Sequence, residues 1–348
     1  MIAHIAQAVG APTPTLVIDA RPIPSDEPGL RTVLTTARAW LADHGHEGVL
    51  KIALVSPSAH PLFDLDYRFV QALPQGLDQF DFRGSCGHSI LSSVLVADTW
   101  GWLPSLAPAS RVRVRVLNNG DHVVCEVDEA RRGAGTFTVH FVQEPDKTLN
   151  DLLLTGNPHD PLLTACGVHE ASLVATGNPY VFVDATSLGL TSRQALFGAG
   201  PDTYACLQQI RVAAATALGW PADSVFPKIA AVGAYEPGRL AVRAISVPTW
   251  HPTLALTGAT CLAAATAIPD TIPARLLEQA GGGLENIVVD SPHGTTNIAA
   301  ALDTSTDQPA LQWVSVSDKQ AHLRGPVRIP ELSTYLYQES LSWQPANA

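Results

Sequence analysis

Charged side chains are scarce in this chain of 348 residues, where Asp, Glu, Lys and Arg together make up 15% of the sequence. The charge is also unbalanced, since 32 acidic residues and 21 basic residues give a formal net charge of -11. This balance argues against a nucleic acid partner, because phosphate groups would be repelled. No apolar run is long enough to span a bilayer, and the N-terminus lacks the basic flank and cleavage site of a signal peptide. We therefore expect a cytoplasmic protein that binds neither nucleic acid nor membrane.

Closely spaced cysteine pairs are missing as well. No two cysteines form a Cys-x-x-Cys pair, and the five that occur are Cys86, Cys125, Cys166, Cys206 and Cys261. An odd, scattered set of this kind predicts neither a disulfide framework nor a zinc site. We expect no metal, no cofactor, and a monomer or homodimer that acts on a small molecule.

Hydrophobic residues make up 46% of the chain, which is enough for a large core and for two domains. Short apolar segments between Gly, Pro and Asn turns predict strands. These segments are residues 51–55, 111–117, 122–127, 136–142, 180–185, 228–232, 240–247 and 286–290. Apolar residues at helical spacing predict helices over 28–44, 87–100, 203–218 and 258–267.

Cys86 lies in a turn of small residues that opens the second of these predicted helices. A thiol at a helix start meets unpaired backbone N–H groups and the positive end of the helix dipole, and both favour the thiolate. The position therefore makes Cys86 a candidate acid, base or nucleophile. The alternative is a buried structural cysteine.

The tripeptide Cys86-Gly87-His88 resembles the Cys-Gly-Asn turn of the methylaconitate cis-trans isomerase and oxalomesaconate tautomerase family. This family is a branch of the diaminopimelate epimerase-like superfamily. Further similar segments follow in the same order between residues 51 and about 330. They include Lys51-Ile52-Ala53-Leu54-Val55, residues 64–71, Gly177-Asn178-Pro179-Tyr180, Pro227-Lys228-Ile229-Ala230 and Thr257-Gly258-Ala259.

The resemblance implies an α+β fold of two pseudo-symmetric domains with the active site between them. Each domain would be a curved, mostly antiparallel sheet wrapped around a central helix. We place the first domain at residues 1–166 and the second at 167–329, and we expect 330–348 to return to the first. The central helices are expected to begin at Cys86-Gly87 and at Thr257-Gly258.

The resemblance also implies the reaction. In the two-base racemases of the superfamily a cysteine begins each central helix, whereas Thr257 stands at the second position here, and a hydroxyl is a poor base near neutral pH. This disfavours racemisation. In the isomerase branch, the residues that match Lys51 and Cys86 move a proton across an allylic system, with Lys51 as the base. Two alternatives remain. Lys51 could be an ordinary lysine at a strand edge, and His88 could be the base.

The family pattern also assigns a set of substrate-binding positions. They are Ser85, Gly87, His88, Asn178, Ser246, His251, Thr257, Gly258, His293, Gly294 and Thr295. Lys228 is expected to be a buried structural cation.

The chain departs from the family near its N-terminus. The usual Arg-Gly-Gly-Thr-Ser-Lys-Gly segment aligns with residues 10–16, where both cations are missing and two prolines occur. We therefore expect a divergent member whose substrate is less anionic than a tricarboxylate, and larger or a specialised metabolite. The alternatives are another reaction that begins with deprotonation, such as cyclisation or elimination in specialised metabolism, and a binding protein without turnover.

Overall fold

A computed structural model describes residues 2–143, 147–245, 249–305 and 307–332. The helices are α1 (Glu27–Asp43), α2 (Gly87–Thr99), α3 (Arg193–Phe197), α4 (Pro201–Ala217), α5 (Leu256–Ala267) and α6 (Ile272–Gln279). The strands of the N-terminal half are β1 (Ile2–Ala8), β2 (Thr15–Asp19), β3 (Lys51–Pro57), β4 (Leu65–Ala72), β5 (Phe80–Asp81), β6 (Arg111–Val116), β7 (His122–Arg131) and β8 (Ala134–Val142). Those that follow are β9 (Asp160–Thr164), β10 (Gly167–Thr176), β11 (Asn178–Asp184), β12 (Lys228–Glu236), β13 (Arg239–Ala244), β14 (Ile287–Ser291), β15 (Gly294–Asp303) and β16 (Ala310–Arg328).

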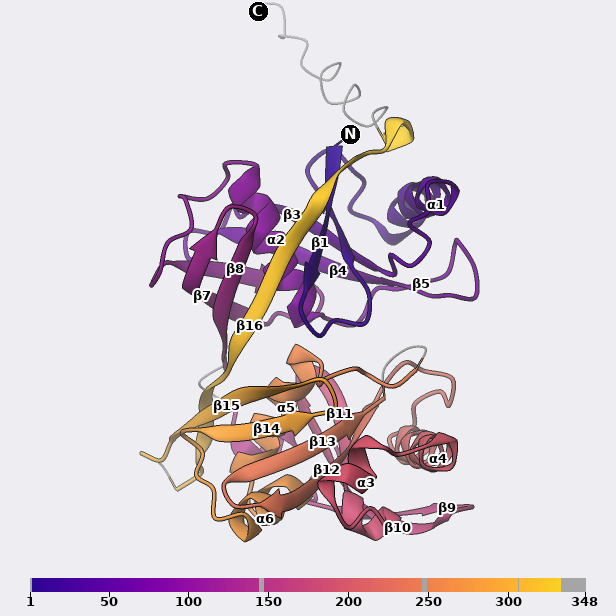
Figure 1. The fold of residues 1–348 in the computed structure, drawn as a ribbon, viewed down its shortest axis with the longest axis vertical. Helices are drawn as coiled ribbons and strands as arrows, with labels where there is room; N and C mark the ends of the chain where they lie inside the picture. Colours follow the sequence, from indigo (N-terminus) through magenta and orange to yellow (C-terminus); the bar gives the residue numbers. More distant parts are fainter. Residues whose placement is uncertain (1, 144–146, 246–248, 306, 333–348) are drawn as a thin grey trace, which may run out of the picture.

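The two halves repeat one strand arrangement, as predicted from the family resemblance. In the first half β2 is parallel to β3, β3 is antiparallel to β4, and β4 is parallel to β6. In the second half β11 is parallel to β12, β12 is antiparallel to β13, and β13 is parallel to β14. The halves lie one above the other in Figure 1, and the long strand β16 runs from one to the other.

The repeat extends to individual residues. Thr15 on β2 pairs with Lys51, the first residue of β3, and Tyr180 on β11 pairs with Lys228, the first residue of β12. The two lysines open the matching sequences Lys-Ile-Ala-Leu-Val and Lys-Ile-Ala-Ala-Val. Lys51 and Lys228 therefore occupy equivalent positions in the two halves.

The central helices α2 and α5 are the most deeply buried elements. Every residue of α5 is buried, and so are all residues of α2 from Gly87 to Ala97. Their sequences carry no Lys or Arg and only one acidic residue, Asp98 near the end of α2, so that all sides of each helix can enter the core. In contrast, α1 buries one stripe that includes Leu30, Val33, Leu34, Ala37 and Leu41, at the spacing of an amphipathic helix.

Three strand pairings cross the predicted domain boundaries at residues 166 and 329. Strand β9, which precedes residue 166, pairs with β10, and β16, which ends before residue 329, pairs with β8 and β1 of the first half. The division stays a prediction, and residues 333–348 of the predicted returning segment lie outside the described residues.

The four predicted helices are present as α1, α2, α4 and α5, while α3 and α6 were not predicted. One start is corrected: α5 begins at Leu256 and not at Thr257, so that Ala255 is its N-cap residue. In the described part of the chain, no helix is both long and apolar enough to cross a membrane.

The prediction that the cysteines form no disulfide is wrong. Cys166 and Cys206 are joined by a disulfide across 40 residues of sequence. The hairpin of β9 and β10 packs on α4, and this tertiary contact brings together two cysteines that are far apart in the sequence. Cys166 and Cys206 are therefore not free thiols in this structure.

Candidate active site

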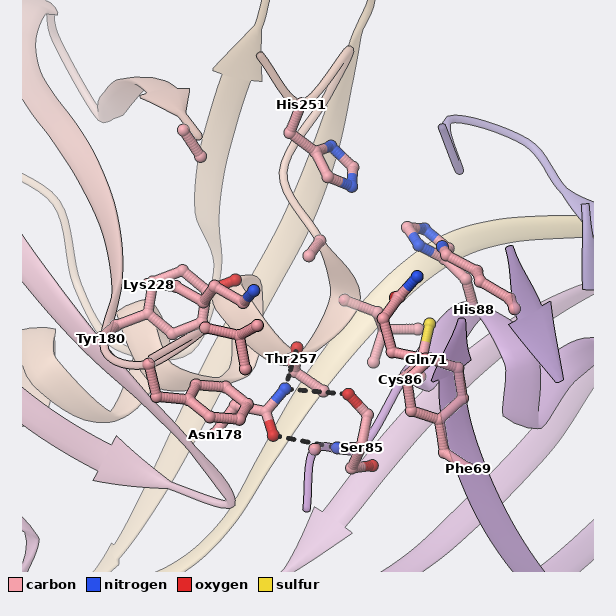
Figure 2. Close-up of a pocket in the computed structure, with 18 of the residues that line it drawn as sticks. Phe69, Gln71, Ser85, Cys86, His88, Asn178, Tyr180, Lys228, His251 and Thr257 are labelled. Atoms are coloured by element: carbon pink, nitrogen blue, oxygen red, sulfur yellow. Dashed lines mark hydrogen bonds between the residues drawn. The ribbon is translucent and has the colours of Figure 1, made fainter. Parts of the chain in front are cut away.

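A cleft lies between the two halves, at the N-terminal ends of α2 and α5, and encloses a cavity of about 80 Å³. Predicted site residues that line it are Lys51, Ser85, Cys86, Gly87, His88, Asn178, His251 and Thr257. Figure 2 shows most of these side chains converging from both halves. The fold therefore assembles into one site the residues that the family resemblance assigned to catalysis, together with much of the predicted substrate-binding set.

Cys86 is the N-cap residue of α2, and no side chain caps this helix end. Its carbonyl oxygen accepts hydrogen bonds from the backbone N–H groups of Ser89 and Ile90, at 3.0 and 3.1 Å. The Tyr67 hydroxyl donates a third, at 3.0 Å. These bonds fix the backbone of Cys86 and leave its thiol, which is partly exposed, at the cleft wall beside the positive end of the helix.

The other free cysteines have a different environment. Burial raises the pKa of both Cys125 and Cys261 to about 12. The Cys261 thiol donates to the carbonyl oxygen of Val174 at 3.2 Å, inside the core, as its position one turn into the helix predicted. Among the described free cysteines, Cys86 is thus the one that can reach a substrate.

Ala255 occupies the position in the second half that Cys86 occupies in the first. Each is the N-cap residue of a central helix, each lines the cleft, and neither helix has a side-chain cap. A methyl group exchanges no proton. The conclusion that a second catalytic thiol is missing therefore holds, but the residue that replaces it is Ala255 and not Thr257.

Asn178 connects the two halves at the floor of the cleft. Its side-chain oxygen accepts from the Ser85 backbone N–H at 3.1 Å, and its amide nitrogen donates to the Ser85 carbonyl at 2.8 Å and to Thr257 Oγ1 at 3.2 Å (Figure 2). These bonds use both donors of the amide. Asn178 therefore holds the residue before Cys86 against the start of α5.

Lysine is concentrated near the cleft. The chain has four lysines, and Lys51, Lys228 and Lys319 are the three that lie at the cleft or beside it. The pKa of Lys228 is lowered to about 8, mainly by burial; Asp81 opposes this shift, and Arg211 and Lys51 contribute to it. Burial likewise lowers the pKa of Lys319 to about 8. The structure thus supplies cations that the N-terminal segment lacks.

Two histidines face each other across the cleft. The rings of His88 and His251 are nearly parallel, with their centres 6.1 Å apart. Burial lowers the pKa of His251 to about 3, and Lys51 and Lys319 add to this effect. The pKa of His88 is also well below its usual value, first through burial and then through the same lysines. Both rings are therefore neutral near pH 7, and Nε2 of His88 is buried without a hydrogen-bond partner in the described structure.

Some predicted substrate-binding residues do not reach the cleft. His293 lies in the turn between β14 and β15, Gly294 and Thr295 are the first residues of β15, and all three are exposed. Gly258 is buried inside α5, where the Tyr180 hydroxyl would lie 2.6 Å from an added Cβ. Ser246 lies outside the described residues.

Sequence reasoning missed Lys228 as a cleft residue and missed Lys319 altogether. Two signals could have found them. One is the scarcity of lysine, because a residue type that occurs four times in 348 positions is not a general surface residue in this chain. The other is the repeated Lys-Ile-Ala sequence at Lys51 and Lys228, which marks corresponding strands of an internal repeat.

Comparison with known proteins places this chain in a family. The family model described as PrpF protein matches residues 44–330. A 3-methylitaconate isomerase of Eubacterium barkeri is 24% identical over 75% of this chain and 79% of its own length. A 2-methyl-aconitate isomerase of Cupriavidus necator is 26% identical over 80% of this chain and 82% of its own.

Structure comparison agrees with the sequence comparison. A crystal structure of methylitaconate-delta-isomerase superposes with a TM-score of 0.66, covers 94% of this chain and 95% of its own, and is 21% identical. The predicted diaminopimelate epimerase-like fold is thereby confirmed. Because the family model spans most of the sequence, the chain belongs to the PrpF family and is an isomerase.

Proposed function

We propose that the protein moves a double bond within a small unsaturated dicarboxylic acid by transferring a proton, without a cofactor. The observation that carries this proposal is the pairing in one cleft of Lys51, at the start of β3, with Cys86, at the start of α2. Ala255 at the opposite helix start leaves no second thiol for racemisation between two sulfurs. An asymmetric pair of an amine and a thiol suits removal of a proton at one carbon and its return at another.

The proposed reaction has three steps. The amine of Lys51 takes a proton from the carbon next to the double bond, and the resulting negative charge spreads through the double bond onto a conjugated carboxylate. The electron pair of the broken C–H bond forms the new double bond. The thiol of Cys86 then gives a proton to the carbon two positions away, and proton exchange between solvent and the two groups restores the starting state.

The charges around the cleft support a dicarboxylate. With Lys51 acting as the base, Lys228 at the cleft wall and Lys319 beside it are left to pair with carboxylates of the substrate. The starts of α2 and α5 add partial positive charge and backbone N–H groups, as helix N-termini do for anions. Neutral His88 can donate or accept a hydrogen bond without adding charge. Two cations balance two carboxylates and leave a third uncompensated.

The size of the cavity also supports a small substrate. Pockets that bury drug-sized ligands typically measure about 300–1,000 Å³, whereas this cavity measures about 80 Å³. This supports a substrate of few heavy atoms. It does not support the larger substrate that the altered N-terminal segment led us to expect.

Proton NMR in deuterated buffer tests the proposal directly. A substituted itaconate should show loss of a C–H signal through deuterium exchange together with the signals of the isomerised acid. Cis-aconitate and trans-aconitate should react at least tenfold more slowly at equal concentration, because each charge-assisted bond left unmade costs about 1.5–3 kcal/mol. Faster turnover of the aconitates would refute the dicarboxylate assignment. Exchange without any isomer would favour another reaction that begins with deprotonation.

A further inference from the structure

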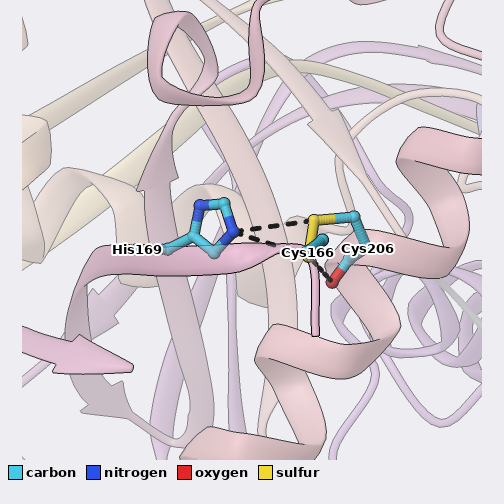
Figure 3. Close-up of side chains that lie close together, drawn as sticks. All are labelled: Cys166, His169 and Cys206. Atoms are coloured by element: carbon cyan, nitrogen blue, oxygen red, sulfur yellow. Dashed lines mark hydrogen bonds between the residues drawn. A yellow bond between two sulfur atoms is a disulfide. The ribbon is translucent and has the colours of Figure 1, made fainter. Parts of the chain in front are cut away.

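A second cluster of reactive side chains lies where the β9–β10 hairpin meets α4 (Figure 3). Cys166 is in the hairpin turn, His169 is on β10 and Cys206 is on α4. Nε2 of His169 lies 3.5 Å from Cys166 Sγ and 3.7 Å from Cys206 Sγ. None of these residues lines the cleft, so the proposed isomerisation does not use them.

We propose that this cluster binds Zn²⁺ when its cysteines are reduced, and that the disulfide is its oxidised, metal-free form. Two thiolates and one imidazole are typical zinc ligands. With Zn–S near 2.3 Å and Zn–N near 2.0–2.1 Å, tetrahedral geometry places a ligand nitrogen about 3.5 Å from each ligand sulfur. The imidazole of His169 already lies at this distance from both sulfurs. Once the disulfide is reduced, only the two sulfur atoms have to move apart.

The environment of His169 is a second, independent observation. The residue is 6% exposed, and its Nδ1 atom is buried without a hydrogen-bond partner among the described residues. Burying an unpartnered polar atom is unfavourable, so the packing and not a bond through Nδ1 holds the ring in this orientation. The neutral tautomer with its proton on Nδ1 leaves the Nε2 lone pair directed toward the sulfurs, where a metal ion would use it.

Solvent can reach the cluster from one side. Cys166 is exposed, which gives an ion a path of entry and leaves a fourth coordination position for water. The Thr164 hydroxyl lies 3.1 Å from Cys166 Sγ and donates its one proton to the Gly167 carbonyl oxygen at 2.9 Å, so it can bond to the thiolate by turning that proton toward the sulfur. Such a bond from outside the ligand set orients the ligand and stabilises its negative charge.

The zinc and disulfide forms exclude each other because both use the same sulfur atoms. A dithiol reductant supplies two electrons and two protons, which convert the disulfide into two cysteine thiols while the reductant forms its own disulfide. Zn²⁺ then displaces the two thiol protons, which pass to solvent. Zinc binding by this chain should therefore depend on the redox state.

The test uses the full chain, reduced with excess dithiol and then freed of reductant in oxygen-free, metal-free buffer. Titration with Zn²⁺ against a chromophoric chelator should show one ion bound per chain, and the oxidised chain should bind none. Cys166→Ser, Cys206→Ser and His169→Ala should each weaken binding more than about 100-fold, because losing even an outer-shell partner costs 10–100-fold. Cys86→Ser is the matched control and should bind zinc as the native chain does.

Cobalt provides a second measurement with the same proteins. Co²⁺ in the reduced native chain should give sulfur-to-cobalt charge-transfer absorption, which either cysteine variant should reduce and the Cys86→Ser control should keep. The proposal is overturned if the reduced native chain binds no zinc, or if His169→Ala binds it as tightly as the native chain. It is also overturned if the Cys166–Cys206 bond stays intact in the folded chain under excess dithiol.

Discussion

Lys51 and Cys86 have different tasks in the proposed reaction, and variants can separate them. Lys51→Ala should abolish both deuterium exchange and product formation, because the variant lacks the base that removes the proton. Cys86→Ser should keep some exchange but form product about 10²–10⁴-fold more slowly, since a hydroxyl is a much weaker acid than a thiol. Exchange and product are read from the same NMR time course. Near-native turnover by Lys51→Ala would require another base, with His88 the first to test.

The charge of Lys228 destabilises the folded protein by an amount that depends on pH. Its folded pKa of about 8 lies below the ordinary 10.5, so the unfolded chain binds more protons than the folded chain between these values. The cost is therefore fully present below pH 8 and disappears as the pH rises toward 10.5. Lys228→Met should raise the free energy of unfolding by about 1–3 kcal/mol at pH 7, and by much less near pH 10.

Urea denaturation at the two pH values measures this difference. Lys147→Met is a suitable control, because Lys147 is exposed and its substitution should change stability little at either pH. The same Lys228→Met variant should bind the substrate more weakly at pH 7, since it loses a cation at the cleft wall. If Lys228→Met were stabilised equally at both pH values, the charge of Lys228 would not be the cause of the gain.

At the scale of elements, the closeness of α2 and α5 depends on one glycine. A Cβ atom added to Gly87 would lie 2.5 Å from Leu256 Cδ2 and 2.8 Å from Leu256 Cβ. Because both residues are buried and lie in the first turn of their helices, neither can move aside easily. Gly87→Ala should destabilise the protein by about 1–3 kcal/mol and lower kcat/KM by displacing Cys86.

The control for this substitution is Gly48→Ala. Gly48 is exposed, and an added Cβ would have no atom within 4 Å. Its urea midpoint should stay close to that of the native chain. If Gly87→Ala were as stable and as active as Gly48→Ala, the contact between the two helices would not constrain the cleft.

At the scale of the whole molecule, the sequence predicted those parts of the structure that have local signals. Apolar runs without charge predicted both central helices, and the turn at Cys86 predicted the start of α2. The start of α5 was misplaced because Ala255 and Leu256 carry no capping side chain that would mark it. The contribution of Lys319 also had no local signal, since it depends on β16 passing beside both halves.

The disulfide is another feature that has no local signal in the sequence. Cys166 and Cys206 have no characteristic spacing, and only the packing of a hairpin on α4 brings them together. At residues 293–295, in contrast, a local sequence signal led to a wrong expectation. The sequence there suits an anion-binding turn, but the pairing of β14 with β15 places these residues at the surface.

Substitution of Asn178 tests whether the hydrogen bonds between the two halves are needed for activity. Asn178→Ala would remove the hydrogen bonds to Ser85 and Thr257 and leave the N–H and carbonyl of Ser85 buried without these partners. Each of these two groups costs about 1–3 kcal/mol, so the free energy of unfolding should fall by about 2–6 kcal/mol. Because Ser85 precedes Cys86, kcat should also fall, while KM should change less.

The kinetic pattern separates this positioning role from the substrate-binding role that the family resemblance implies. A residue that mainly binds substrate would raise KM and leave the unfolding free energy almost unchanged. Asn178→Asp refines the comparison, because it keeps an oxygen for the Ser85 N–H but loses the amide donor to the Ser85 carbonyl and Thr257. It should retain part of the stability that Asn178→Ala loses. An Asn178→Ala protein with native stability and a raised KM would show that Asn178 acts on the substrate and does not couple the halves.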